Sequence, residues 1–296
     1  MQHATRRGFV RGAAMTGAAL GLPGILAAGQ EDAGKAAWRP RLALSSVMFS
    51  GLPLEDFCAH AAKLGFKGID LWGPFGSCRH LTQARELGSD GFLKLLDRHR
   101  LGLAAWTTYR TKGHDEGFPG FAEFIGTCGS GVVVRESKYG SVARDQLEAA
   151  LRTFFEELKP EIRLARKHKV RLAIENHSGA ILDTLESIEI FTRLNPAPEV
   201  VGIALAPYHL QARKVPVADA IHACGGQLRF FYAWQLAKGV DELPGHGPAD
   251  FAPWLRALAR QDFRHWMTPF THGGLPADEM SSAVIKAMRY LNSIAI

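Results

Sequence analysis

The chain has 296 residues, of which 47% are hydrophobic and 22% charged, with 31 glycines and 15 prolines. This composition is that of a globular protein and excludes disorder, collagen and coiled coil. The formal net charge is +6, but Arg6, Arg7 and Arg11 lie in an N-terminal segment without acidic residues. The remainder has 32 basic against 29 acidic residues and no basic stripe, so we expect no nucleic-acid partner.

Residues 1–29 have the features of a twin-arginine signal peptide. The run from Thr5 to Arg11 (TRRGFVR) matches the export motif, an Ala/Gly-rich segment follows, and Ala27-Ala28-Gly29 offers a cleavage site. The alternative, a membrane anchor, is disfavoured because the segment is short, glycine-rich and interrupted by Pro23. We therefore expect export to the periplasm by the twin-arginine route and no stable membrane span after processing. Residues 30–40 are expected to form a loose junction before a single domain over 41–296.

Four cysteines, Cys58, Cys78, Cys128 and Cys224, contain no CxxC pair. Three of them sit in apolar helical patterns and are expected to be small core residues. Cys78 differs because His80 follows two residues later, so a reactive thiol is an alternative there.

Short β-rich runs alternate with amphipathic helical patterns along the whole domain. About eight such units over about 255 residues are typical of a single (β/α)8 TIM barrel in the α/β class. The alternative, a doubly wound sheet, is weakened because no GxGxxG follows the first strand. The predicted strands are 42–49, 68–72, 103–109, 132–136, 171–175, 201–205, 228–234 and 266–270. The predicted helices are 54–64, 92–100, 121–128, 147–167, 185–194, 217–224, 251–259 and 278–291.

Polar and aromatic residues follow nearly every predicted strand. In a TIM barrel the chemistry is carried by the carboxyl ends of the strands, which meet at one face. A barrel without a binding site would end its strands mainly with loop residues such as Asp, Ser and Gly, and so many aromatic and polar residues would not be needed there. The sequence therefore predicts a ligand-binding site at that face.

Two segments resemble a known family. Leu172-Ala173-Ile174-Glu175-Asn176-His177 resembles strand five of the xylose-isomerase-like barrels, the sugar phosphate isomerase/epimerase superfamily. The strand 201–205 with Pro207-Tyr208-His209-Leu210 resembles strand six, and 245–255 resembles the approach to strand eight. The resemblance implies a divalent metal held by Glu, Asp, His and Glu from strands five to eight. It also implies ketose–aldose interconversion or epimerisation beside a carbonyl.

Only part of that metal site is present in this sequence. Glu175 matches the strand-five ligand, whereas Ala206, Tyr232 and Phe270 stand where the resemblance implies Asp, His and Glu. The substrate-contacting His of strand six is matched by His209. We expect Glu175, His209 and His272 to be both the catalytic residues and an open three-ligand metal site. One carboxylate and two imidazoles suit Mn, Zn, Co or Fe better than Mg, and the alternative is no metal.

Further residues near the strand ends are predicted to bind a small-molecule carbohydrate. Aromatic rings pack against the C–H faces of sugars, although core packing is equally consistent with each ring alone. For Glu175 the alternative is a salt bridge to a loop arginine, and His246 is expected to be a turn residue. The predicted substrate-binding residues are Trp72, His80, Glu136, Lys138, His177, Tyr232 and Trp234.

Three functions fit these residues. The first is an exported isomerase or epimerase that moves a proton next to the carbonyl of a neutral sugar or keto-sugar. The second is a lyase or hydrolase that begins with the same step and releases a leaving group from a 3-keto-glycoside. The third is a non-catalytic carbohydrate-binding barrel, which Ala206 and Phe270 favour.

The export motif can be tested directly. Replacing both Arg6 and Arg7 with Lys is expected to trap the precursor in the cytoplasm, because the transporter recognises the arginine pair. Pulse-chase fractionation measures this. Processed protein that reaches the periplasm at the normal rate would contradict the twin-arginine assignment.

Overall fold

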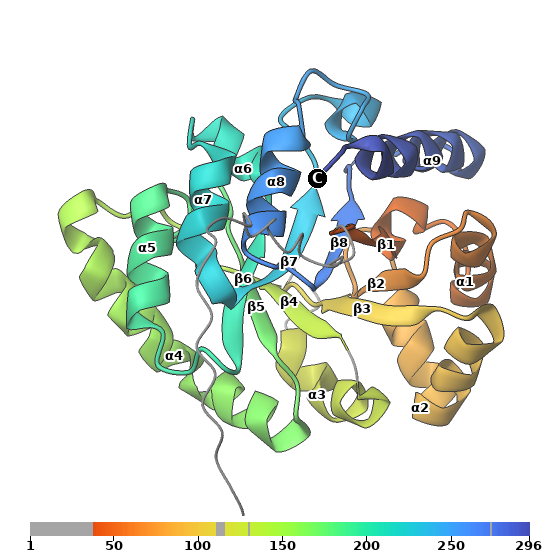
Figure 1. Cartoon of the computed structure of the whole chain (residues 1–296). Coiled ribbons are helices and arrows are strands. Elements are labelled where there is room, and N and C mark those ends of the chain that lie inside the picture. The colour runs from red at the N-terminus through yellow and green to blue at the C-terminus, as the bar shows by residue number, and fades with distance from the viewer. Residues whose placement is uncertain (1–37, 111–115, 130, 273) are drawn as a thin grey trace, which may run out of the picture. The chain divides into compact units, whose positions relative to one another are not determined.

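Eight parallel strands close into one barrel in the order β1 to β8, which confirms the predicted TIM barrel. The computed structural model describes residues 38–110, 116–129, 131–272 and 274–296 (Figure 1). The predicted signal peptide and residues 30–37 of the junction lie outside this part of the chain. The strands are β1 (Arg41–Ser45), β2 (Gly68–Trp72), β3 (Gly102–Thr107), β4 (Val132–Glu136), β5 (Leu172–Glu175), β6 (Val201–Leu205), β7 (Leu228–Ala233) and β8 (Trp266–Pro269).

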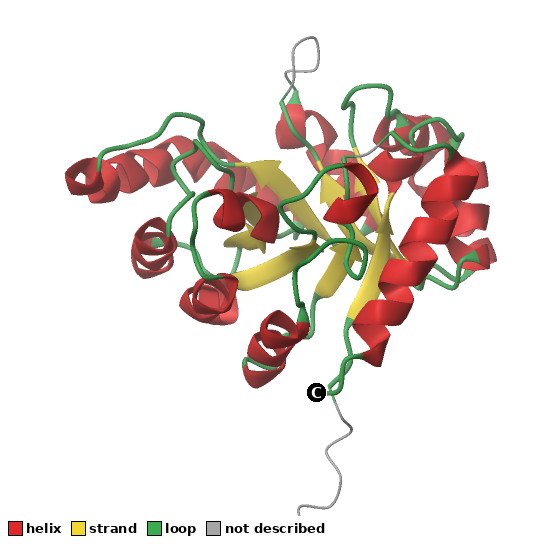
Figure 2. Cartoon of the chain, turned by 90° about the horizontal axis from the view of Figure 1, so that it is seen from above, coloured by secondary structure: helices red, strands yellow, loops and turns green. Residues whose placement is uncertain are grey.

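Helices surround the strands, as the view from above shows (Figure 2). Each predicted helix is present, and two of them begin well before the predicted residue: α2 at His80 and α3 at Gly117. The helices are α1 (Leu54–Lys63), α2 (His80–His99), α3 (Gly117–Cys128), α4 (Leu147–His168), α5 (Leu185–Leu194), α6 (Pro207–Ala212), α7 (Val217–Cys224), α8 (Ala252–Arg260) and α9 (Ala277–Ser293). No helix among the described residues is long and apolar enough to cross a membrane.

Two local predictions need correction. The predicted first strand ends at Ser45, and Ser46–Phe49 form a 3-10 helix. Burial of Met48 and Phe49 continues the apolar run, so hydrophobicity alone does not show where the strand stops. No helix was predicted directly after β6, but Pro207–Ala212 form α6. Proline suits the first turn of a helix because its ring fixes φ in the helical range.

Side chains pack in two separate layers on the two sides of the sheet. Outward residues of the strands, such as Leu44 and Ile203, pack with the apolar faces of the helices. Inward residues fill the barrel axis, where small side chains such as Ala173 and Ala204 oppose the large ring of Phe230. The axis is therefore a packed core, and only the two ends of the barrel can bind ligands.

Part of the expected junction is ordered. Trp38 is buried, and its indole Nε1 donates a hydrogen bond to the carbonyl of Phe263 at 2.8 Å. This hydrogen bond therefore connects the segment before β1 with the segment before β8. All four cysteines are free and buried. This confirms the core assignment of Cys58, Cys128 and Cys224 and shows that Cys78 is buried as well.

Gly202 gives a direct test of the packing inside the barrel. A Cβ at this position would lie 2.3 Å from the backbone oxygen of Gln227 and 2.5 Å from Cγ of Arg229. Gly202→Ala is therefore expected to reduce the free energy of unfolding by about 1–3 kcal/mol, as overpacking does. Urea denaturation measures this. Gly226→Ala is the control, because nothing lies within 4 Å of its added Cβ. Equal losses in both variants would contradict the packing described.

Candidate functional site

Glu175 lies at the end of β5 inside the mouth of the barrel. The residue is 6% exposed, and no hydrogen bond joins its side chain to another described residue. Burial raises the pKa of this carboxyl well above its usual range, and the nearby Asp70 raises it further. The salt bridge to a loop arginine, weighed above as the alternative, is absent among the described residues. A carboxyl with this environment holds its proton more strongly than an ordinary glutamate and is suited to accept and return protons.

Asp70, on β2, is the opposite case. Its carboxylate accepts hydrogen bonds from Ser45 Oγ at 2.8 Å, Trp72 Nε1 at 2.7 Å and Thr107 Oγ1 at 2.7 Å. Burial nevertheless raises its pKa to about 6, because the loss of solvation exceeds the effect of the three donors. The hydroxyl of Tyr232 lies 3.0 Å from Thr107 Oγ1. Asp70 is therefore a fully satisfied structural carboxylate beneath the mouth.

This network assigns an internal role to two residues that were predicted to bind substrate. The polar atoms of Trp72 and Tyr232 are used by Asp70 and Thr107, so only the faces of their rings are left for a ligand. Asp70 and Thr107 were not among the predicted site residues. Their places in the alternation of β2 and β3 could have indicated that both side chains point into the barrel.

Aromatic rings form the wall of the mouth. Trp72 stacks on Phe270 with ring centroids 5.6 Å apart, and Trp234 stacks on Tyr208 at 4.2 Å. The edge of Trp234 meets Phe270 at 5.1 Å, which joins the two stacks. The indole Nε1 of Trp234 is buried and has no acceptor among the described residues. A buried donor without a partner is rare and indicates a place for a ligand or water oxygen.

Three histidines stand beside these rings. His177 and His209 lie with ring centroids 3.8 Å apart, and His209 Nδ1 is 3.2 Å from Ser178 Oγ. Burial, then the neighbouring His177 and His272, lower the pKa of His209 to about 3, so this imidazole is neutral at pH 7. His272 is exposed and contacts the indole of Trp234 at 4.8 Å. His209 and His177 are thus brought together, and His272 is joined to them through Trp234.

Asn176 holds the helix that carries His209. Its Oδ1 accepts a hydrogen bond from the backbone N–H of Ala206 at 2.6 Å, and its Nδ2 donates to the Ala206 carbonyl at 3.2 Å. The side chain thereby joins the ends of β5 and β6 and fixes the start of α6. The position of His209 thus depends on the residue next to Glu175.

The three predicted metal ligands do not form a ligand set. Within the described part of the chain, no three His, Cys, Asp or Glu side chains are grouped so that they could hold a metal ion. The indole of Trp234 contacts both His209 and His272 and supplies no ligand atom. Ala206 and Phe270, at two positions where the resemblance implies ligands, also supply none. The residues therefore do not fit the expected divalent ion, and we derive no chemical step through one.

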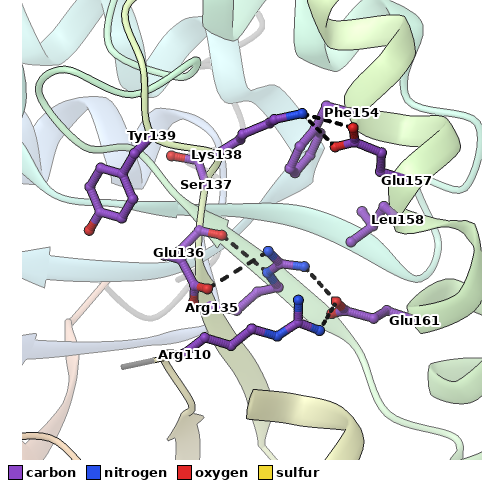
Figure 3. A pocket seen from close by; sticks show the side chains of 10 residues that line it. All are labelled: Arg110, Arg135, Glu136, Ser137, Lys138, Tyr139, Phe154, Glu157, Leu158 and Glu161. Atoms are coloured by element: carbon purple, nitrogen blue, oxygen red, sulfur yellow. Dashed lines mark hydrogen bonds and ion pairs between the residues drawn. The ribbon is translucent and has the colours of Figure 1, made fainter. Parts of the chain in front are cut away.

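Glu136 and Lys138 lie in a cavity of about 290 Å3 at the side of the barrel, between the end of β4 and α4 (Figure 3). Lys138 points toward α4, where its Nζ is 2.8 Å from Glu157 Oε1. Glu161 likewise binds Arg135 at 2.8 Å and Arg110 at 3.2 Å. The basic side chains of this cavity are paired. Burial raises the pKa of Glu136, whose register partner across the sheet is Glu175.

His80 is part of the core. The residue is 1% exposed, its Nε2 is 2.7 Å from the carbonyl of Leu52, and its ring stacks on Phe57 at 5.2 Å. Its Nδ1 lies 3.5 Å from Sγ of Cys78, and burial raises the pKa of that thiol to about 11. Both ring nitrogens of His80 are thus used within the fold. His246, expected in a turn, follows the 3-10 helix Gly239–Glu242 and lies 3.0 Å from the carbonyl of Ala283.

Residues 58–293 match the family model of the xylose isomerase-like TIM barrel. The chain belongs to this family. No curated protein matches the chain. Among solved structures, the zinc-bound IolI protein is 18% identical with a TM-score of 0.68, and the alignment covers 86% of this chain and 99% of that one. The 3-keto-D-glucoside 4-epimerase YcjR of E. coli is 13% identical with a TM-score of 0.67 and the same coverage. A D-psicose 3-epimerase is 14% identical with a TM-score of 0.64, again over 86% and 99%. These similarities establish the fold.

The buried carboxyl of Glu175 predicts a pH-dependent effect on stability. Its pKa is raised in the folded state, so its protonated form favours folding, and this contribution is lost as the pH rises through the folded-state pKa. Glu175→Gln removes the buried charge. At pH 8 the melting temperature of the variant is expected to exceed that of the wild type by about 2–4 °C for each kcal/mol of destabilisation that the substitution removes. At pH 4 the two melting temperatures are expected to be equal.

Calorimetry of both proteins at the two pH values measures the effect. Asp70→Asn is the matched control: it is expected to lower the melting temperature, because an amide NH2 would face donors that now bind a carboxylate. A Glu175→Gln variant less stable than the wild type at pH 8 would show that the carboxylate has a stabilising partner.

Proposed function

We propose that the protein is an enzyme that moves a proton next to the carbonyl of a neutral sugar or keto-sugar, with Glu175 as the acid–base group. The observation that carries the proposal is the isolation of this carboxyl: it is buried in the mouth, has a raised pKa and binds no described residue. An unpartnered buried carboxyl costs stability, so its retention is best explained by chemistry.

The neighbouring groups complete a proton-transfer site. As a base, Glu175 would take the proton from the carbon next to the carbonyl and return it to the same or the adjacent carbon. The negative charge that develops on the carbonyl oxygen needs hydrogen-bond donors. Two buried groups are available: the unpartnered Nε1 of Trp234, and Nε2 of the neutral His209, whose Nδ1 is engaged by Ser178.

The surroundings favour a neutral substrate. The stacked rings of Trp72 with Phe270 and Trp234 with Tyr208 offer flat apolar faces for the C–H groups of a sugar. The cations nearest the end of β4 are already engaged by Glu157 and Glu161, so they are not free to bind a phosphate. A neutral sugar also agrees with the twin-arginine export expected from the sequence, which remains part of this proposal.

Two other functions use the same mouth. A lyase or hydrolase of 3-keto-glycosides would start with the same proton abstraction and then expel the group at the neighbouring carbon. Of two structural relatives, a 3-keto-D-glucoside 4-epimerase is named for an epimerisation and a probable 3-DHS dehydratase for an elimination, which is the lyase type of reaction. A non-catalytic carbohydrate-binding barrel is favoured by the missing ligand positions at Ala206 and Phe270.

Proton exchange in D2O tests the proposal. The wild type is expected to exchange the hydrogen next to the carbonyl of a free ketose or of a 3-keto-glucoside, followed by NMR. Glu175→Gln should lower the rate by about 10²–10⁴-fold, the usual contribution of a general base. For the wild type, kcat/KM should rise with pH through the raised pKa of Glu175, because only the carboxylate form can accept a proton.

Lys138→Gln is the matched control, because that lysine is exposed and paired with Glu157. Its rate should equal that of the wild type. Release of the aglycone with the keto-glucoside would identify the lyase or hydrolase. If the wild type binds sugar saturably but catalyses no exchange, the proposed enzymatic activity is wrong and the non-catalytic carbohydrate-binding barrel is supported.

A further inference from the structure

Basic residues gather at the opposite end of the barrel, where the strands begin. Arg41 is the first residue of β1, Arg171 directly precedes β5, and Arg229 is the second residue of β7. Because the strands are parallel and closed, these three positions share one edge of the barrel. With His265 and Trp266 they line a cavity of about 370 Å3.

The cavity carries positive charge without a balancing acid. Its lining contains three arginines and one histidine but no Asp or Glu. Within the described part of the chain, no carboxylate forms an ion pair with Arg41, Arg171 or Arg229. By contrast Arg264, next to His265, is paired with Asp262.

Two of the arginines are held in place by the fold. The guanidinium of Arg41 lies 4.2 Å from the ring centroid of Trp266 and donates a hydrogen bond to the carbonyl of Arg264 at 3.2 Å. Arg229 donates from Nη2 to the carbonyl of Pro198 at 2.7 Å, while its buried Nε has no partner. The stem of Arg229 crosses the space left by Gly202, the same close contact that excludes a side chain there.

The basic groups of the cavity lie close enough to lower each other's pKa. Burial and then Arg171 lower the pKa of Arg229. Burial followed by Arg229, Arg171 and Arg41 lowers the pKa of His265 to about 4. Like charges gathered without a counter-ion raise the free energy of the folded state, and a bound anion would reverse that effect.

We propose that this cavity binds a small phosphate-type oxyanion, either free phosphate or a phosphate monoester. Arginine presents planar pairs of N–H donors that match the oxygens of such a group. The cavity has the size of a small-molecule site, and its charges converge instead of forming the stripe that a nucleic acid requires. The site lies at the end of the barrel opposite Glu175, so it is independent of the proposed reaction.

Calorimetric titration of the full chain with inorganic phosphate tests the site, with sodium chloride at equal ionic strength as the reference. Binding is expected with a Kd below about 1 mM, a modest affinity in the usual range for small ligands. Arg171→Gln should weaken it at least tenfold. Arg171 is exposed, so this variant is expected to fold normally. Arg264→Gln, on the same face but paired with Asp262, should leave the Kd unchanged.

A second measurement locates the anion. In NMR titrations phosphate should raise the pKa of His265 from about 4, because the anion offsets the three arginine charges. Tighter binding of glycerol 3-phosphate than of phosphate would identify an ester as the ligand, and the reverse would identify free phosphate; both support the site. No binding above the chloride reference, or an equal loss in Arg171→Gln and Arg264→Gln, would overturn it.

Discussion

Closing eight parallel strands places their inward side chains on one narrow axis, where a polar group cannot reach bulk water. Such a group must find its partners inside the barrel or remain desolvated. Asp70 takes the first course and accepts hydrogen bonds from Ser45, Trp72 and Thr107. Glu175, at the end of β5, has no such donor among the described residues. The same geometry thus produces one carboxylate that supports the fold and one that is free for chemistry.

The strands were predictable because their buried runs alternate with amphipathic helices, and every predicted strand overlaps an observed one. The errors have local physical causes. Met48 and Phe49 are buried in a 3-10 helix, so their hydrophobicity extended the first predicted strand. Pro207 begins a short helix that was not predicted, and this helix brings His209 into contact with His177.

The direction of a site residue could be predicted only where the residue lies within a strand. The parity of β5 places Glu175 inward, as the sequence suggested, and the structure keeps it in the mouth. Lys138 and His80 have partners within the fold that are not visible in sequence. Glu157 lies on the facing side of α4, and Leu52 supplies a carbonyl to His80 from a separate loop. The three expected metal ligands do not form a ligand set among the described residues for a similar reason. Whether ligands converge depends on the directions of side chains beyond the strand ends, and the sequence does not show these directions.

The two ends of the barrel carry ionisable groups of opposite type without a partner among the described residues. A carboxyl without donors lies at one end, and three arginines without acids lie at the other. They cannot neutralise each other, because the axis between them is filled by packed side chains such as Ala173, Ala204 and Phe230. Each end therefore lowers the stability of the unliganded protein separately, and a ligand that binds only the folded state would restore it by mass action. The destabilisation at each end is thus a physical basis for selecting a ligand there.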